Sequence, residues 1–132
     1  MNQVTTSAVK DTALLIIASR DLALGLAALL LSIPPLRHVE RVRGPAAFWQ
    51  RLTDEQQPAL VVLDANEVGA ATSRVIQTAR AVAPDTRYLV LSDSVAESRA
   101  LTADGIESVL VKGADPAHLV DAIENLLSDD HP

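Results

Sequence analysis

Short stretches in which nearly every residue is apolar constrain the fold of this chain most strongly. They cover residues 14–17, 60–63, 88–91 and 109–111. A strand that is covered by helices on both faces has a continuous apolar sequence, which is typical of parallel sheets. Segments with helical spacing separate these runs, so the sequence predicts an open α/β fold.

The pattern predicts five strands and about five helices in one domain. We expect strands at residues 13–17, 36–42, 60–63, 87–91 and within 106–111, the second as an exposed edge strand because its residues alternate. We expect helices at 22–32, after 44–45, at 71–83, at 95–102 and after 115–116, with Asp21 as the cap of the first and a loop at 67–70. Right-handed crossovers then give a doubly wound parallel sheet over residues 12–127. Residues 1–11 are expected to be a flexible leader, and 128–132 an acidic tail or the start of a linker.

Three of the predicted strands are followed at once by a polar residue. Asp64 closes the third strand, Ser92 the fourth and Lys112 the fifth. Because the carboxyl ends of parallel strands share one edge of the sheet, we expect these side chains to meet there, where open α/β proteins bind ligands. The first strand is followed by Ala18-Ser19-Arg20 and carries no carboxylate at this edge.

Composition excludes several kinds of function. The 132 residues carry a net charge of −6, which argues against direct binding of this domain to nucleic acid. There is no cysteine, hence no disulfide framework or thiolate metal site, and a cytoplasmic location is expected. The longest apolar stretch, 22–31, is about half of the roughly 20 residues needed to cross a bilayer, so we expect no membrane contact. The turn after the first strand has no glycine-rich phosphate cradle, and we do not expect an enzyme.

At about residues 13–127 the chain resembles the receiver domains of bacterial two-component response regulators, and especially those that precede helix-turn-helix output domains. The resemblance rests on three segments and the helix after the last of them: Val62-Leu63-Asp64, Leu89-Val90-Leu91-Ser92, and Leu110-Val111-Lys112-Gly113-Ala114-Asp115-Pro116 followed by Leu119-Val120-Asp121-Ala122-Ile123. It implies a flavodoxin-like fold with strand order 2-1-3-4-5.

The resemblance also implies a role for each polar residue at the sheet edge. Asp64 corresponds to the aspartate that accepts a phosphoryl group from a histidine kinase. Ser92 would donate a hydrogen bond to a phosphoryl oxygen, and Lys112 would neutralise its charge. Asp64 and the backbone carbonyl of Asn66 would be ligands of Mg²⁺.

The chain departs from the family pattern where the metal is held. Ala18 and Ser19 occupy the positions of the two acidic residues, Arg20 follows them, and Val109 replaces the usual aromatic residue of the last strand. Mg²⁺ prefers carboxylate ligands, so we expect weak Mg²⁺ binding or none, and no other cofactor. One hypothesis is that Arg20 enters the metal position and pairs with Asp64. The alternative is that Arg20 points to solvent.

The sequence therefore predicts a receiver-like signalling domain that regulates a partner or output domain through protein contacts, with weak or no Mg²⁺-dependent phosphorylation. The alternative is an active phosphoacceptor that takes its phosphoryl group from a histidine kinase at Asp64. A homodimer through the last two helices is the form of self-association that the resemblance implies.

Overall fold

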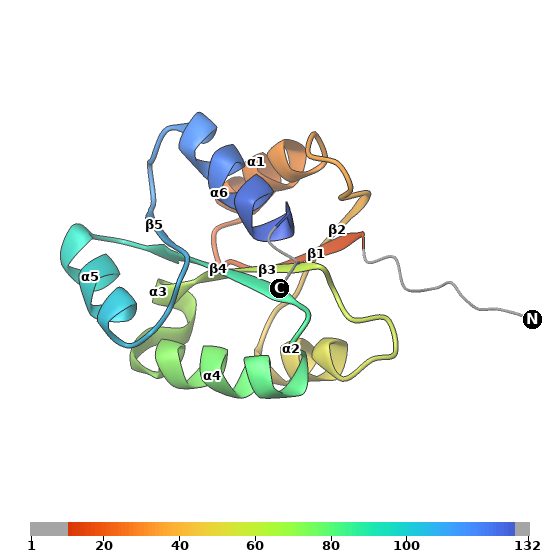
Figure 1. Cartoon of the computed structure of the whole chain (residues 1–132), viewed down its shortest axis with the longest axis horizontal. Helices are drawn as coiled ribbons and strands as arrows, with labels where there is room; N and C mark the ends of the chain where they lie inside the picture. The colour runs from red at the N-terminus through yellow and green to blue at the C-terminus, as the bar shows by residue number, and fades with distance from the viewer. Residues whose placement is uncertain (1–10, 129–132) are drawn as a thin grey trace, which may run out of the picture.

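The computed structural model describes residues 11–128, so residues 1–10 of the expected leader and 129–132 of the expected tail lie outside the described residues. Strands and helices alternate along this part of the chain (Figure 1). In order they are β1 (Thr12–Ile16), α1 (Arg20–Leu30), β2 (His38–Arg41), α2 (Pro45–Leu52), β3 (Leu60–Asp64), α3 (Ala65–Val68), a 3₁₀ turn (Gly69–Ala71), α4 (Thr72–Val82), β4 (Arg87–Ser92), α5 (Val95–Ala103), β5 (Val109–Val111) and α6 (Pro116–Ser128).

The five strands form one sheet in the order β2-β1-β3-β4-β5, and every neighbouring pair is parallel. This confirms the expected doubly wound α/β fold and its strand order. β2 is an edge strand, as its alternating sequence predicts. β5 is the other edge and is shorter than expected, because only three residues pair with β4.

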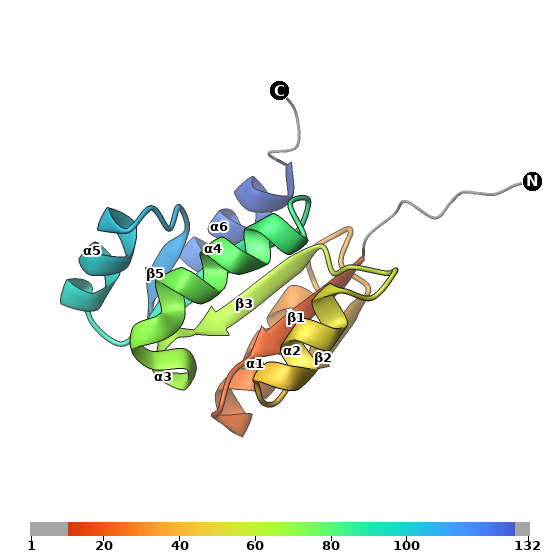
Figure 2. The same ribbon diagram turned by 90° about the horizontal axis from the view of Figure 1, so that it is seen from below.

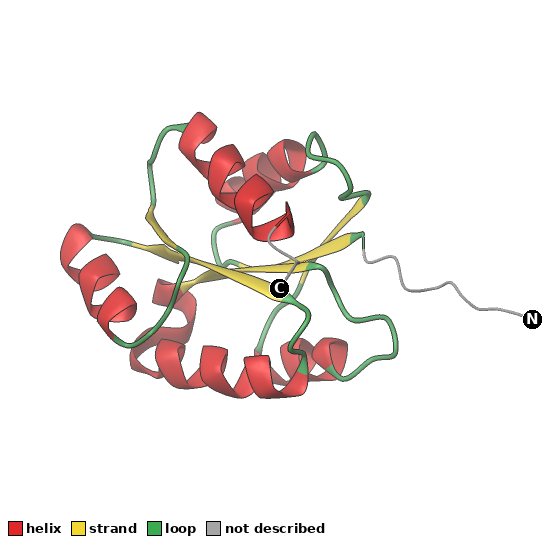
Figure 3. Cartoon of the chain, in the orientation of Figure 1, coloured by secondary structure: helices red, strands yellow, loops and turns green. Residues whose placement is uncertain are grey.

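Helices cover both faces of the sheet (Figure 3). On one face α1 and α6 pack on the odd-numbered positions of β1 and their neighbours, and Ile123 of α6 is fully buried there. On the other face lie α2, α4 and α5, which Figure 2 shows from the side of α2 and α4. Each strand side chain therefore enters one of two apolar layers, which is why the strand sequences are apolar throughout.

Helix α1 begins earlier than the sequence predicts. The cap is Ser19, whose hydroxyl accepts the Leu22 N–H at 3.2 Å, and the expected cap Asp21 lies inside the first turn. Serine and aspartate cap helices about equally well, so residue type could not decide between them.

The expected loop at 67–70 is helical in the structure. Asp64 accepts the Asn66 N–H and thereby caps the single turn α3, and the 3₁₀ turn follows. At the end of α4, Val82 is exposed and Ala83, the residue that follows the helix, is buried. Within the described residues, no helix is both long and apolar enough to cross a bilayer.

Candidate functional site

The polar strand-end residues do meet at one edge of the sheet. Asp64 is the last residue of β3, and Ser92 is the last residue of β4. Lys112 follows β5, and its backbone N–H bonds the Ser92 carbonyl at 2.8 Å. Gly113 then adopts a φ of 85°, a left-handed conformation that favours glycine, so the chain turns away from the sheet directly after the lysine.

Asp64 lies in the floor of this site. Its side chain is buried, with the residue only 3% exposed. One carboxylate oxygen, Oδ1, accepts the Asn66 N–H at 2.9 Å and lies 2.7 Å from Lys112 Nζ. A buried carboxylate is tolerated when a counter-charge and hydrogen-bond donors replace its water. The same side chain thus caps α3 and forms the central ion pair of the site.

Lys112 bridges two carboxylates. Its Nζ lies 2.7 Å from Asp64 Oδ1 and 2.7 Å from Asp93 Oδ1, both at the short distance typical of charge-assisted hydrogen bonds. Burial alone would lower the pKa of Lys112, but the hydrogen bonds and negative charges of the two carboxylates outweigh it and raise that pKa above its ordinary value. The ammonium is therefore protonated at neutral pH.

Asp93 is a site residue that the sequence reasoning missed. The residue directly after Ser92 is an aspartate, and that position was the available signal. Asp93 is the first residue of the β4–α5 loop and lies outside the strand, yet its side chain reaches the same edge of the sheet. The site therefore holds two carboxylates and one ammonium.

Ser92 is present at the edge but directs its hydroxyl to backbone groups. The residue is fully buried, and Oγ donates to the Ser94 carbonyl at 3.2 Å and, at the limit of a hydrogen bond, to the Leu110 carbonyl at 3.5 Å. A hydroxyl this deeply buried needs such acceptors. The role of Ser92 as a phosphoryl contact stays a prediction.

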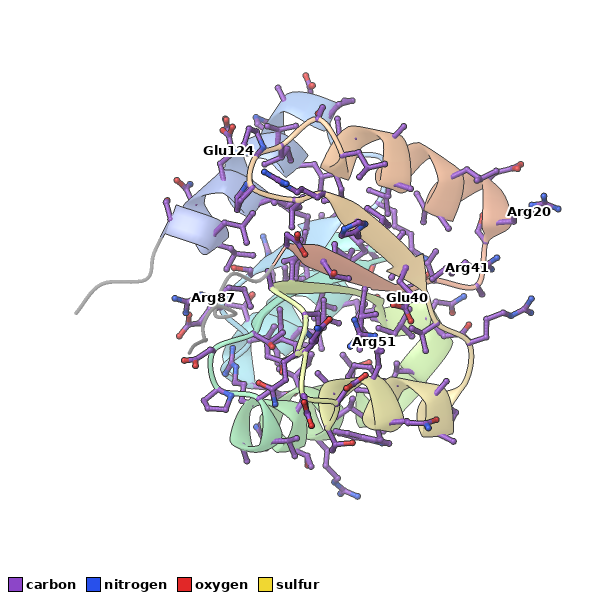
Figure 4. All side chains as sticks on the ribbon, turned by 90° about the vertical axis from the view of Figure 1, so that its right-hand side faces the viewer. Arg20, Glu40, Arg41, Arg51, Arg87 and Glu124 are labelled. Carbon is purple, nitrogen blue, oxygen red and sulfur yellow. The ribbon has the colours of Figure 1, made fainter. Side chains whose placement is uncertain are left out.

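The structure does not bring Arg20 to Asp64. Arg20 is the first residue of α1, is exposed, and extends outward from the helix in Figure 4. No ion pair joins it to Asp64 among residues 11–128. The hypothesis that its guanidinium pairs with Asp64 is therefore wrong, and the exposed side chain agrees with the alternative that Arg20 points to solvent.

Arg41 is the cation that holds the β1–α1 connection. It ends β2, and its guanidinium donates from Nε to the Ile17 carbonyl at 3.0 Å and from Nη2 to the Ala18 carbonyl at 2.6 Å (Figure 4). The alternation of residues 36–42 gave no reason to single it out. A fork of two donors fixes both carbonyls of the loop at once.

The residues at this edge do not fit a Mg²⁺ ion bound by two carboxylates after β1, the arrangement that the resemblance to receiver domains implies. Positions 18 and 19 supply no carboxylate, and the carbonyls of Ile17 and Ala18 accept from Arg41. Asp64 Oδ1 already accepts from Lys112 and from the Asn66 backbone. No cluster of three or more histidine, cysteine, aspartate or glutamate side chains suited to a metal occurs in the described part of the chain.

A mostly apolar cavity of about 280 Å³ lies beside the site, on the face covered by α2 and α4. Its walls come from the ends of β1 and β3 and from α2, α3 and α4, and they include Ile16, Leu63, Phe48, Trp49, Glu67 and Val75. Trp49 is only half-buried, packs against Phe48 with 4.9 Å between the ring centroids, and lines this cavity.

No protein-family model matches the chain, and no curated protein sequence matches it either. Solved structures do. A response regulator receiver protein from Sinorhizobium medicae is 23% identical with a TM-score of 0.75, covering 93% of this chain and 98% of the other. The receiver domain of a DNA-binding response regulator from Colwellia psychrerythraea is 20% identical with a TM-score of 0.72, covering 89% and 98%. A LuxR-family DNA-binding response regulator from Silicibacter pomeroyi is 21% identical with a TM-score of 0.70, covering 89% and 91%. Strand order, helix layers and these likenesses agree: the chain has the fold of response regulator receiver domains.

Proposed function

We propose that this chain is a receiver-like signalling module that regulates a protein partner or an output domain through protein contacts, and that it takes up phosphoryl groups at Asp64 weakly or not at all. The observation that carries the proposal is the internal ion pair between Asp64 and Lys112 at 2.7 Å, formed without any carboxylate from the β1–α1 connection.

The charge of the site supports a weak reaction with phosphoryl donors. A carboxylate that attacks a phosphoryl group needs cations to neutralise the charge that accumulates on the phosphoryl oxygens. Here one ammonium serves two carboxylates, and Arg41 is bonded to backbone carbonyls. The two carboxylates and the one ammonium of Lys112 therefore leave a net negative site.

The proposed contact surface is formed by α5, β5 and α6. β5 is an edge strand, and its three apolar residues are only half-buried. Val95 of α5 is 57% exposed. In α6 only Ile123 is fully buried, while four large apolar side chains that pack against the core stay partly accessible: Leu119, Val120, Leu126 and Leu127. Apolar area of this kind is suited to a protein partner or a second copy of the chain.

We place the module in the cytoplasm, where histidine kinases and output domains would reach it.

The experiment is incubation with acetyl phosphate and Mg²⁺, followed by intact-mass spectrometry. We expect little or no phosphoryl adduct on the natural sequence and none on Asp64→Asn. A paired variant, Ala18→Asp with Ser19→Asp, restores carboxylates to the β1–α1 connection, and aspartate still caps α1. We expect a larger adduct on this variant, lost again when Asp64→Asn is added.

A robust adduct at Asp64 of the natural sequence would contradict the proposal and favour the second candidate, an active phosphoacceptor. The observation in favour of that candidate is the meeting of Asp64, Lys112 and Ser92 at one edge of the sheet. In that reaction an Asp64 carboxylate oxygen would attack phosphorus, and acetate would leave with the electrons of the broken P–O bond.

A further inference from the structure

Asp93 contacts the cation of the site, Lys112, but it is not one of the three residues predicted at the strand ends. It begins the β4–α5 loop, and its Oδ1 lies 2.7 Å from Lys112 Nζ, the same distance as the Asp64 oxygen. An ammonium has three donors. Two of them are directed at carboxylates that belong to the chain itself.

The local backbone places Asp93 at this position. Its N–H donates to Glu97 Oε1 at 2.8 Å, and the Glu97 N–H donates to Ser94 Oγ at 3.1 Å, so reciprocal bonds close the start of α5. The neighbouring Ser92 hydroxyl donates to the Ser94 carbonyl on the same loop. The Lys112 N–H bonds the carbonyl of Ser92, the residue before Asp93. Two adjacent strand ends therefore bring the acid and the lysine together.

Stability alone does not account for this contact. The Asp93 side chain is 50% exposed, and a half-exposed ion pair stabilises a fold by roughly 0–1 kcal/mol. Asp64 is the buried partner that needs the ammonium. The clearer consequence of Asp93 is electrostatic, because it adds a second negative charge where an anion would approach Lys112.

We propose that Asp93 is a positioning residue that acts as a built-in anion for Lys112 and thereby lowers the affinity of the Asp64 site for phosphate-type oxyanions. The inference rests on the proposed function, since it names the residue that keeps the site closed to phosphoryl groups. An incoming tetrahedral oxyanion must displace the Asp93 carboxylate or approach a cluster with two negative charges and one positive charge.

The test is a titration with inorganic phosphate, in buffer free of Mg²⁺ and at constant ionic strength, followed by the amide chemical shifts of Asn66 and Lys112. We expect Asp93→Asn to bind phosphate about fourfold tighter or more, the factor that removal of one unit charge at about 5 Å contributes in water. Asp93→Glu keeps the charge, and we expect wild-type affinity. Asp85→Asn is the matched control, because it makes the same charge change at an exposed residue before β4, at the opposite end of that strand.

An unchanged phosphate affinity in Asp93→Asn overturns the inference, and so does an equal gain in Asp85→Asn. A second readout is the side-chain pKa of Lys112 measured by NMR. Asp93 is one of the groups that raise this pKa, so Asp93→Asn is expected to lower it, and an unchanged value counts against the contact in solution.

The titration uses no phosphoryl donor, so its failure is distinguishable from failure of the proposed function. A robust adduct from acetyl phosphate on the natural sequence, together with tighter phosphate binding by Asp93→Asn, defeats the proposed function and leaves this inference standing. Absence of an adduct, together with equal phosphate affinities of the natural sequence and Asp93→Asn, supports the proposed function and defeats this inference.

Discussion

At the scale of single residues, Asp64 and Lys112 depend on each other unequally. Asp64 is almost fully buried, and Lys112 is its only charged partner among the described residues, whereas Lys112 also contacts the half-exposed Asp93. Removal of the lysine strands a buried carboxylate. Removal of the aspartate charge leaves the ammonium with a partner. The two substitutions should therefore differ in cost, although they break the same contact.

We expect Lys112→Met to lower the free energy of unfolding by about 2–3 kcal/mol, less than the ~3–5 kcal/mol typical of a fully buried pair because Lys112 reaches solvent. Asp64→Asn is expected to cost less, since the amide oxygen still accepts the Asn66 N–H. The double variant should recover most of the loss of Lys112→Met. Urea denaturation at neutral pH measures all three, and a double variant no more stable than Lys112→Met would contradict the stranded-charge explanation.

The sequence predicted the positions of Asp64, Ser92 and Lys112 because strand ends follow from apolar runs. The expected pairing of Lys112 with Asp64 is present, but the sequence did not predict Asp93 as a second partner of Lys112, or the cation at the β1–α1 connection. Asp93 and Arg41 both reach the edge from segments where the pattern changes: the first residue of a loop and the end of an alternating edge strand. Pairings of this kind depend on side-chain direction, which periodicity does not specify.

At the scale of elements, two exposed apolar surfaces compete as sites of association. One is the surface of α5, β5 and α6, with Val95 on α5. The other is the outer side of α1, where Leu24 is 60% exposed. The resemblance points to the last two helices, and residues 22–31, most of which belong to α1, are the longest apolar stretch of the chain. Only the first surface also contains a half-covered edge strand.

We expect the protein to self-associate through α5, β5 and α6. Val95→Lys places a charge on this surface without disturbing the core, so it is expected to shift sedimentation velocity toward the monomer. Leu24→Lys is the matched control, since it makes a similar change at an equally exposed residue of α1. Dissociation by Leu24→Lys, with Val95→Lys unaffected, would assign the interface to α1.

Element boundaries were harder to predict than element types, for local reasons. A cap at Ser19 or at Asp21 was equally compatible with the sequence of the first helix, and in the structure the Ser19 hydroxyl accepts the Leu22 N–H. The turn α3 was missed because its cap is the functional residue Asp64, which the sequence reasoning treated only as an acid at a strand end. The strand-end position of Asp64 predicted its place at the sheet edge, but it gave no sign that the same carboxylate caps a helix.

At the scale of the whole molecule, the protonation of one side chain shows whether helix α4 is packed on the sheet. Tyr88, the only tyrosine of the chain, is buried on β4 and donates its hydroxyl to the carbonyls of Ala79 and Ala83, at 3.0 and 3.3 Å. Burial raises the pKa of Tyr88 to about 12, although the Arg80 charge and a hydrogen bond with Thr86 act in the opposite direction. The phenol therefore keeps its proton in the folded protein at a pH where it would lose it in the unfolded chain.

The sign of the linkage follows from proton binding. Between pH about 10, the ordinary tyrosine value, and the folded value near 12, the folded state holds more protons than the unfolded state, so the free energy of unfolding falls as pH rises through this window. Near-ultraviolet absorbance of tyrosinate measures Tyr88 directly. We expect no ionisation near pH 10 in the folded protein and an ordinary midpoint in concentrated urea. Tyr88→Phe should remove the tyrosine part of this alkaline loss of stability. Because the hydroxyl is held by the end of α4, an ordinary midpoint in protein that is still folded would mean that α4 does not cover β4 as the structure has it.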